Sequence, residues 1–233
     1  MTKSKTLILI LSALLSLTVT ALHAKKKQEL PEVTADGLHR VPDSKLAIVY
    51  AEPGADLGPY NRVSILQAHV AFKKNWARDQ RSSSAQPLRI NSRDIEKIKD
   101  NLSAEFHEVF KNALTEAGYE VTDEVADDVM IVRPAIINLD VNAPDTMSAG
   151  RSTTFTSSAG EMTLYIELYD SVSGDIMAKA LDRRFDRNSG IYTWTNSVTN
   201  KAAANRILKG WAGVLVDALN EARTYDADPG GDS

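Results

Sequence analysis

The stretch that decides the fold is residues 162–185, which reads MTLYIELYDSVSGDIMAKALDRRF. Over residues 162–169 apolar side chains alternate with polar or tyrosine side chains, which is typical of a β-strand packed on one side only. Gly174 supplies a positive φ in the turn that follows, and a second strand is expected at residues 176–185. The two strands therefore predict an antiparallel hairpin.

Further strands are expected upstream of this hairpin. Residues 129–141 are almost continuously apolar, which favours a strand covered on both sides, although Pro134 is typical of an edge or a bulge. Residues 62–72 form a second strand, and residues 46–50 a short edge strand. One face of the 129–141 strand is expected to carry Val129, Ile131, Ala135, Ile137, Leu139 and Val141. One face of the 62–72 strand is expected to carry Leu66, Ala68, Val70 and Phe72.

Two long amphipathic helices are expected, at residues 92–117 and about 198–223. In both, apolar residues recur at a spacing near 3.6 residues, so each helix has one side to bury. Asp94 lies in the first turn of the first helix, where a negative charge suits the helix dipole. Gly118 is placed to end that helix.

These elements predict an α+β fold with the order β-α-β-β-β-α. A helical crossover makes the first two strands parallel if they are neighbours, whereas the hairpin is antiparallel. We expect a mixed, mostly antiparallel sheet of about four to five strands with both long helices packed on one face. A single domain is expected at residues 46–225, after an extended leader at residues 25–45 and before a disordered tail at residues 226–233.

The first residues have the pattern of an export signal. Lys3 and Lys5 precede an apolar run at residues 7–19, and the small residue Ala24 offers a cleavage site. The run is shorter than the roughly 20 residues that a permanent membrane span needs. We therefore expect a signal peptide at residues 1–24 and a periplasmic protein with no stable membrane anchor.

Composition excludes several classes of protein. The chain has no cysteine, so a lipid-modified cysteine, disulfides and thiol catalysis are impossible. Its formal net charge of −4 becomes more negative when the signal peptide and its lysines are removed. Nucleic acid is therefore not expected as a partner, because phosphate contacts call for clustered Lys and Arg.

No catalytic, metal or cofactor motif is found in the sequence. His107 and Glu108 begin like a zinc-protease helix, but Lys111 stands where the second histidine ligand belongs. A nucleophile elbow, a phosphate-binding loop and a dinucleotide fingerprint are all missing from the sequence. We expect no metal and no cofactor.

Several motifs resemble those of a known family. They are the segment Tyr50-Ala51-Glu52-Pro53-Gly54-Ala55-Asp56-Leu57 with Tyr60, the strand into Phe72 and Trp76, and the hairpin Leu168-Tyr169-Asp170 with Ser173-Gly174. Over roughly residues 46–222 the chain resembles exported proteobacterial proteins of the domain-of-unknown-function family thirty-three-thirteen. Many of these are lipoproteins, whereas this chain lacks the anchoring cysteine. The resemblance implies no catalytic residues.

The sequence also suggests an interaction surface. Tyr165 and Tyr169 flank Glu167 on the polar side of their strand, and Trp194 lies near a loop. Tyrosine on a polar strand face is typical of contact surfaces, and packing under the leader or a helix explains it equally well.

Two functions from different classes fit these observations. The first is a non-catalytic cell-envelope protein that binds an unidentified envelope protein through a sheet face, a sheet edge or the segment 142–159. The alternative is a periplasmic hydrolase that uses His69 with a nearby carboxylate such as Asp140. A small-molecule carrier is a third possibility, and it would need an apolar pocket.

Overall fold

The computed structural model describes residues 29–82, 91–141, 155–156, 160–185, 193–194 and 197–227. The chain from Pro31 onward forms one compact unit. Its strands are β1 (His39–Arg40), β2 (Ile48–Ala51), β3 (Arg62–Ile65), β4 (His69–Phe72), β5 (Glu120–Val121), β6 (Val129–Val141), β7 (Phe155–Thr156), β8 (Gly160–Asp170), β9 (Ile176–Phe185) and β10 (Thr193–Trp194). Its helices are α1 (Trp76–Ser82), α2 (Ser92–Glu116) and α3 (Ser197–Ala227).

The centre of the fold is a mixed sheet of eight strands. Seven of them follow the order β1-β2-β9-β8-β6-β3-β5, and β4 pairs with β6 beyond the end of β3. The strands β3, β4, β5 and β6 are joined in parallel, whereas β6, β8, β9, β2 and β1 are joined antiparallel. The strands β7 and β10 form a separate antiparallel pair. The predicted α+β class and mixed sheet are confirmed, but the predicted four to five strands were too few.

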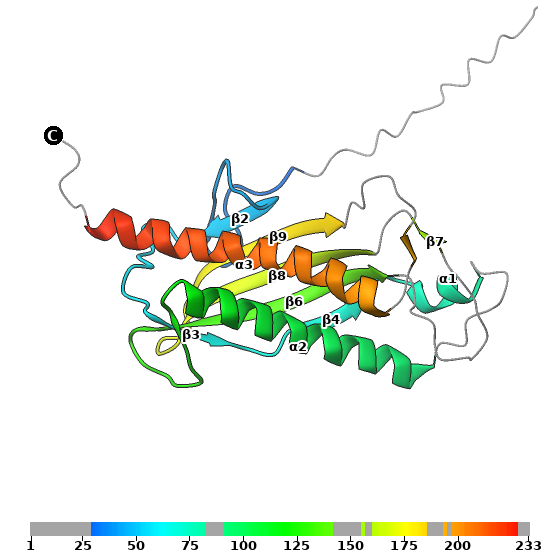
Figure 1. The fold of residues 1–233 in the computed structure, drawn as a ribbon. Coiled ribbons are helices and arrows are strands. Elements are labelled where there is room, and N and C mark those ends of the chain that lie inside the picture. The colour runs from blue at the N-terminus through cyan, green and yellow to red at the C-terminus, as the bar shows by residue number, and fades with distance from the viewer. Residues whose placement is uncertain are drawn as a thin grey trace, which may run out of the picture. The chain divides into compact units, whose positions relative to one another are not determined.

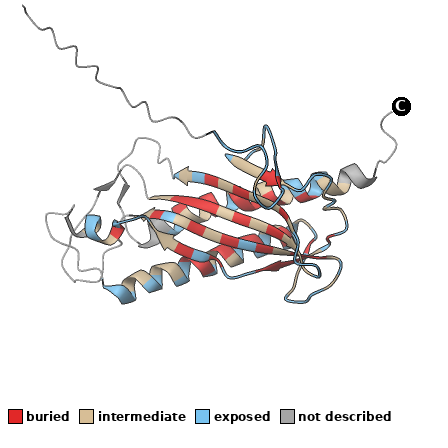
Figure 2. Cartoon of the chain, turned by 180° about the vertical axis from the view of Figure 1, so that it is seen from behind, coloured by how far each residue is buried: buried red, intermediate tan, exposed pale blue. Residues whose placement is uncertain are grey.

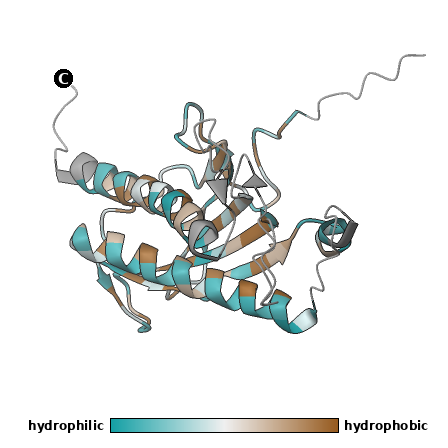
Figure 3. Ribbon diagram, turned by 45° about the vertical axis from the view of Figure 1, so that its right-hand side comes forward, coloured by the Kyte–Doolittle hydropathy of each residue, from teal (hydrophilic) through white to brown (hydrophobic). Residues whose placement is uncertain are grey.

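Helices α2 and α3 lie side by side on one face of the sheet (Figure 1). Asn91 caps α2 by accepting a hydrogen bond from the Asp94 amide, while the Asp94 carboxylate accepts one from the Asn91 amide. This reciprocal capping box satisfies two amides that the helix would leave unpaired. Hydrophilic and hydrophobic residues alternate along both long helices (Figure 3), as the sequence periodicity predicts.

The predicted strand at residues 62–72 is divided into β3 and β4. Val63 and Ile65 are buried, Leu66 is 42% exposed, and Val70 is buried again. Val63 and Val70 pair with Met130 and Ile136 of β6, so both pieces turn apolar side chains toward the helices. The break between the strands shifts the alternation by one position, which is why Leu66 does not share the face of Ala68 and Val70 as the sequence predicts.

A bulge in β6 overturns the predicted faces of that strand. Asn138 has φ of +52°, and the pairing with β8 shifts between Ile137 and Asp140. Leu139 consequently joins Met130 and Ile136 in the core, although the sequence placed it with Ile131 and Ala135, which are only half-buried. The strand is covered by helices on one face only, because Arg133 is exposed on the other.

The element order also differs from the prediction because short pieces of structure escaped the sequence patterns. Strand β1 lies in the expected leader and pairs with β2. Helix α1 lies between β4 and α2, where the sequence analysis expects no element, and its Trp76 donates a hydrogen bond of 2.7 Å to the Val141 carbonyl. The Trp76 ring stacks on Phe72 with centroids 4.0 Å apart. Two-residue strands carry too few residues to show an alternation.

A buried carboxylate fastens α3 to the sheet. Asp182 of β9 is 8% exposed and accepts hydrogen bonds from the Trp211 indole at 2.8 Å and the Arg184 guanidinium at 2.9 Å. Its other oxygen accepts the Ala47 amide, just before β2, at 3.1 Å. Gly210 belongs to this arrangement, because a Cβ there would collide with the Arg184 guanidinium. We call Asp182, Arg184 and Trp211 the Asp182 cluster.

Replacing Asp182 by alanine is expected to lower the free energy of unfolding by about 3 kcal/mol. The substitution leaves the buried Trp211 donor and the Arg184 charge without their acceptor, and such losses are costly. Urea denaturation measures the change. Asp127→Ala, at an exposed carboxylate, is the matched control and should stay within about 0.5 kcal/mol of the wild type. A loss below about 1 kcal/mol for Asp182→Ala would show that the cluster does not hold the helix.

Candidate functional site

The face of the sheet away from α2 and α3 carries the residues singled out in the sequence. We call it the open face, and Figure 2 shows the strands from that side. Leu164, Ile166 and Leu168 of β8 are buried toward the helices. Because side chains alternate along a strand, Tyr165, Glu167 and Tyr169 point to the open face. No helix in the described part of the chain covers them.

The open face continues onto the strands beside β8, because residues that are directly paired across two strands lie on the same face of the sheet. Tyr165 lies opposite Ala135 of β6 and Leu181 of β9, and Glu167 lies opposite Arg133 and Lys179. His69 of β4 also pairs with Ala135 and so joins the row of Tyr165. The open face thus combines tyrosine, aliphatic and charged side chains.

Four of these side chains form one connected group, the Tyr-Arg cluster (Arg133, Tyr165, Glu167 and Tyr169). The Tyr165 hydroxyl donates to the Glu167 carboxylate at 2.6 Å, and the Arg133 guanidinium lies 3.4 Å from the same carboxylate. Glu167 is only 14% exposed in its side chain, whereas Arg133 is 63% exposed. The Arg133 guanidinium therefore offers hydrogen-bond donors to solvent, while the Glu167 carboxylate to which it is paired is also held by Tyr165.

The acid–base properties of the cluster follow from these contacts. Partial burial, together with the hydrogen bond to Glu167, raises the pKa of the Tyr165 phenol above its ordinary value. Partial burial also raises the pKa of Tyr169, and hydrogen bonding to Tyr169 raises the pKa of Arg133. Both phenols thus remain protonated at neutral pH. The cluster therefore offers hydrogen-bond donors and aromatic surface.

Sequence reasoning found three of the four members of the cluster and missed Arg133. Arg133 stood inside an apolar run, and only the pairing of β6 with β8 reveals that it lies opposite Glu167. Trp194 belongs to β10, in the separate pair with β7, and its side chain lies outside the described part. Asp36, in the segment before β1, forms an ion pair with Lys179 beside the cluster. The N-terminal segment therefore reaches the margin of the open face.

The pair proposed for hydrolysis is not brought together. His69 is exposed and pairs with Ala135, whereas Asp140 lies five residues farther along β6. At about 3.3 Å per residue that spacing is roughly 16 Å along the strand. The Asp140 carboxylate instead forms an ion pair of 2.7 Å with Lys73. A general base must lie within hydrogen-bond reach of its partner, so these two residues do not form a catalytic dyad.

The two motifs that carry the family resemblance meet at one end of the sheet. The Tyr60 hydroxyl donates to the Asp170 carboxylate at 2.8 Å, and the Glu52 amide donates to the Met177 carbonyl at 2.8 Å. Amides of Val172 and Ser173 donate to the other Asp170 oxygen at 2.9 and 2.6 Å. These amides and Tyr60 hold the pKa of Asp170 below its usual value, with the Ser173 amide the largest cause. The motifs therefore fasten a loop to a hairpin turn.

Beside this junction lies a polar cavity of about 350 Å³, which Glu52, Asp56, Asp170 and Asp175 line. Within the described ranges, however, no three His, Asp or Glu side chains are placed to hold a metal ion together. Elsewhere Glu124 and Asp128, in the acidic loop before β6, each have a carboxylate oxygen 2.6 Å from the Arg62 guanidinium. The acidic loop is thus bound to an arginine of its own chain.

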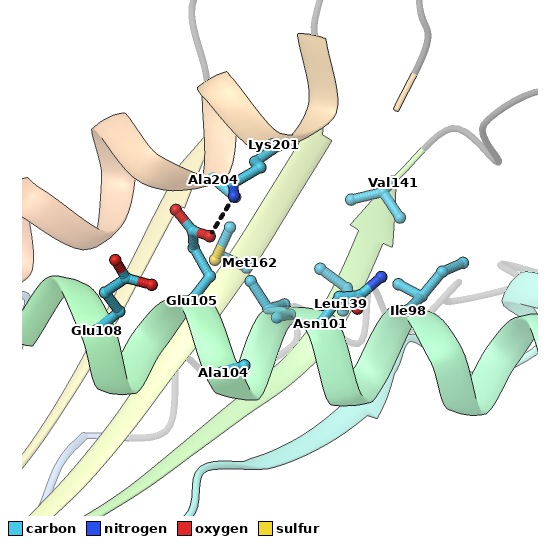
Figure 4. A pocket seen from close by; sticks show the side chains of 11 residues that line it. Ile98, Asn101, Ala104, Glu105, Glu108, Leu139, Val141, Met162, Lys201 and Ala204 are labelled. Atoms are coloured by element: carbon cyan, nitrogen blue, oxygen red, sulfur yellow. Dashed lines mark ion pairs between the residues drawn. The ribbon is translucent and has the colours of Figure 1, made fainter. Parts of the chain in front are cut away.

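A second cavity, of about 450 Å³, lies between α2 and α3 (Figure 4). Glu105 of α2 and Lys201 of α3 point toward one another there, with 3.0 Å between the charged atoms. Asn205 also donates to the Glu105 carboxylate. The polar side chains of this groove therefore link the two helices to each other.

The link between Tyr60 and Asp170 has a measurable pH dependence. Partial burial and the hydrogen bond to Asp170 raise the pKa of Tyr60 to about 12, against about 10 in an unfolded chain. Because the folded state favours the protonated phenol, this stabilisation is complete below pH 10 and is lost as the pH rises toward 12. We expect the free energy of unfolding to fall less steeply over that range in Tyr60→Phe than in the wild type. Equal slopes in urea titrations of the two proteins would contradict the contact.

No helix among the described residues is long and apolar enough to cross a bilayer. None of the proteins with curated descriptions matches this chain. Among solved structures, the PelC dodecamer from Paraburkholderia phytofirmans is 11% identical, with a TM-score of 0.37 and coverage of 71% of this chain and 96% of that one. Protein XCC0632 from Xanthomonas campestris, of family DUF330, is 15% identical, with a TM-score of 0.38 and coverage of 72% and 89%.

A minor lipoprotein from Acinetobacter baumannii is 9% identical, with a TM-score of 0.34 and coverage of 70% of this chain and 95% of that one. With TM-scores below 0.5, these similarities do not indicate a function for this chain. The family described as "Protein of unknown function (DUF3313)" matches residues 34–215, a span that holds both motifs of the Tyr60–Asp170 junction and the whole Tyr-Arg cluster. The resemblance seen in the sequence is thereby confirmed, and the chain belongs to the DUF3313 family.

Proposed function

We propose that this protein is an exported, non-catalytic protein of the cell envelope that binds an envelope protein through the open face of its sheet. The N-terminal pattern supports export, since basic residues, a short apolar run and a small residue follow one another as in a signal peptide. The expected location is the periplasm, with cleavage near Ala24.

The Tyr-Arg cluster is the observation that carries this proposal. Tyrosine and arginine are enriched in protein interfaces and among the residues that contribute most to binding, because they combine a large contact area with hydrogen-bonding groups. Glu167 holds Tyr165 at 2.6 Å and Arg133 at 3.4 Å, so less side-chain entropy is lost when a partner docks. The surrounding Ala135, with the half-buried Leu181, adds apolar area to the same surface.

Photo-crosslinking in intact cells tests this surface. A photoreactive phenylalanine derivative at Tyr169 keeps an aromatic side chain on the open face, and the same group at Asn112, on the exposed side of α2, is the matched control. We expect one envelope protein to be crosslinked from position 169 and not from position 112. Adding Arg133→Glu should lower the yield at position 169 about tenfold, because the residue lies at the centre of the contact.

Identical products from positions 169 and 112 would contradict the proposal, since they would show random collision. The absence of any product from position 169 would also contradict it. The melting temperature of each variant is measured alongside, and a variant that melts as the wild type does separates lost binding from lost folding.

A further inference from the structure

A third cavity lies under α3, on the side of the sheet opposite the open face. It measures about 400 Å³, and its walls are α3, β2, β8, β9 and the segment at residues 41–46. Small side chains leave this space, because alanines line it: Ala178 and Ala180 of β9, Ala51 of β2 and Ala218 of α3. Pockets that hold small molecules in proteins have this size.

The interior of the cavity is apolar. Its polar lining residues are Asp43, Ser44, Lys45, Lys179 and Glu221, and the Lys179 amine is turned away to its ion pair with Asp36. The Trp211 indole also lines the cavity, but its N–H is already bonded to Asp182.

The backbone amides and carbonyls of the strand walls are already hydrogen-bonded, since β9 pairs with β2 on one side and with β8 on the other. A peptide brings amides and carbonyls that need partners, and a buried one without them is costly. A hydrocarbon chain needs none. At about 30 Å³ for a group the size of a water molecule, the cavity has room for roughly a dozen methylene groups.

The mouth of the cavity is lined by charged residues, and exposed ion pairs cross it. Lys45 extends from the 41–46 segment to Asp217 and Glu221 of α3, at 3.0 and 3.3 Å. All three side chains are more than half exposed, so these ion pairs contribute little stability and can open. With Asp43 the mouth carries three carboxylates against one amine, which disfavours an anionic group.

We propose that this cavity binds the alkyl chain of a single-chain amphiphile whose head group is not anionic. The chain lies between α3 and β9 against Trp211, and the head group lies at the mouth beside Lys45 and Glu221. This site is separate from the open face, so a test of amphiphile binding is independent of the test of the proposed function.

Isothermal titration calorimetry of the purified protein tests the proposal. The probe is lauroyl lysophosphatidylethanolamine below the concentration at which it forms micelles. We expect saturable binding that weakens by up to about fourfold for each methylene removed from the lauroyl chain, as full burial of a methylene predicts. Laurate, which has a comparable chain and an anionic head, should bind at least tenfold more weakly.

Two substitutions fill the cavity from opposite walls. Ala178→Leu acts from β9, and Ala218→Phe acts from the exposed margin of α3, where it need not disturb folding. Each should weaken binding at least tenfold. Ala202→Leu, at an exposed position of the same helix that does not line this cavity, is the matched control and should change affinity less than twofold.

The absence of saturable binding by the wild type would overturn the proposal, as would unchanged affinity in Ala218→Phe. Equal weakening by Ala202→Leu would show that the cavity is not the site. Equal binding of laurate would overturn the assignment of the head group. Self-association that Ala218→Phe abolishes, seen by analytical ultracentrifugation, would identify a second copy of this chain as the occupant instead of an amphiphile.

Discussion

The position of α3 on the sheet depends on the Asp182 cluster. A single buried carboxylate joins α3, β9 and the start of β2, because it accepts from Trp211, Arg184 and the Ala47 amide at once. Hydrophobic burial draws α3 onto the sheet without choosing its position along the strands, whereas three directed hydrogen bonds fix that position. A Cβ at Gly210 would meet the Arg184 guanidinium, so glycine there lets that side chain keep its position beside Asp182.

The position of α3 divides the molecule into two faces with different chemistry. The helices cover one face, and small side chains beneath α3 leave an apolar cavity there. The other face receives no helix within the described residues, so its strands carry tyrosine, arginine and aliphatic side chains in an alternating pattern. Both candidate sites thus follow from the placement of α2 and α3 on one face of the sheet. Neither site requires catalytic chemistry.

The sequence was sufficient to predict the long helices and strands, in which an apolar repeat recurs many times. It was insufficient to predict the short elements and the local irregularities. Helix α2 and the hairpin of β8 and β9 were predicted because an apolar repeat recurs several times in each. The bulge at Asn138 and the break after Ile65 were missed, since a shift of one residue leaves no trace in composition. Arg133 was missed for a related reason: cross-strand neighbours are set by register, which a single sequence does not reveal.

Because the chain has no cysteine, one introduced thiol can report whether the open face is covered in the cell. The most direct measurement is the rate at which a small thiol reagent labels Ala135→Cys, beside Tyr165 on that face, and Ala202→Cys on the exposed side of α3. Both should react in the purified protein. In intact cells we predict labelling of Ala135→Cys to slow about tenfold or more while Ala202→Cys reacts as before, as burial under a bound partner requires. Equal rates for Ala135→Cys in cells and in the purified protein would contradict the account.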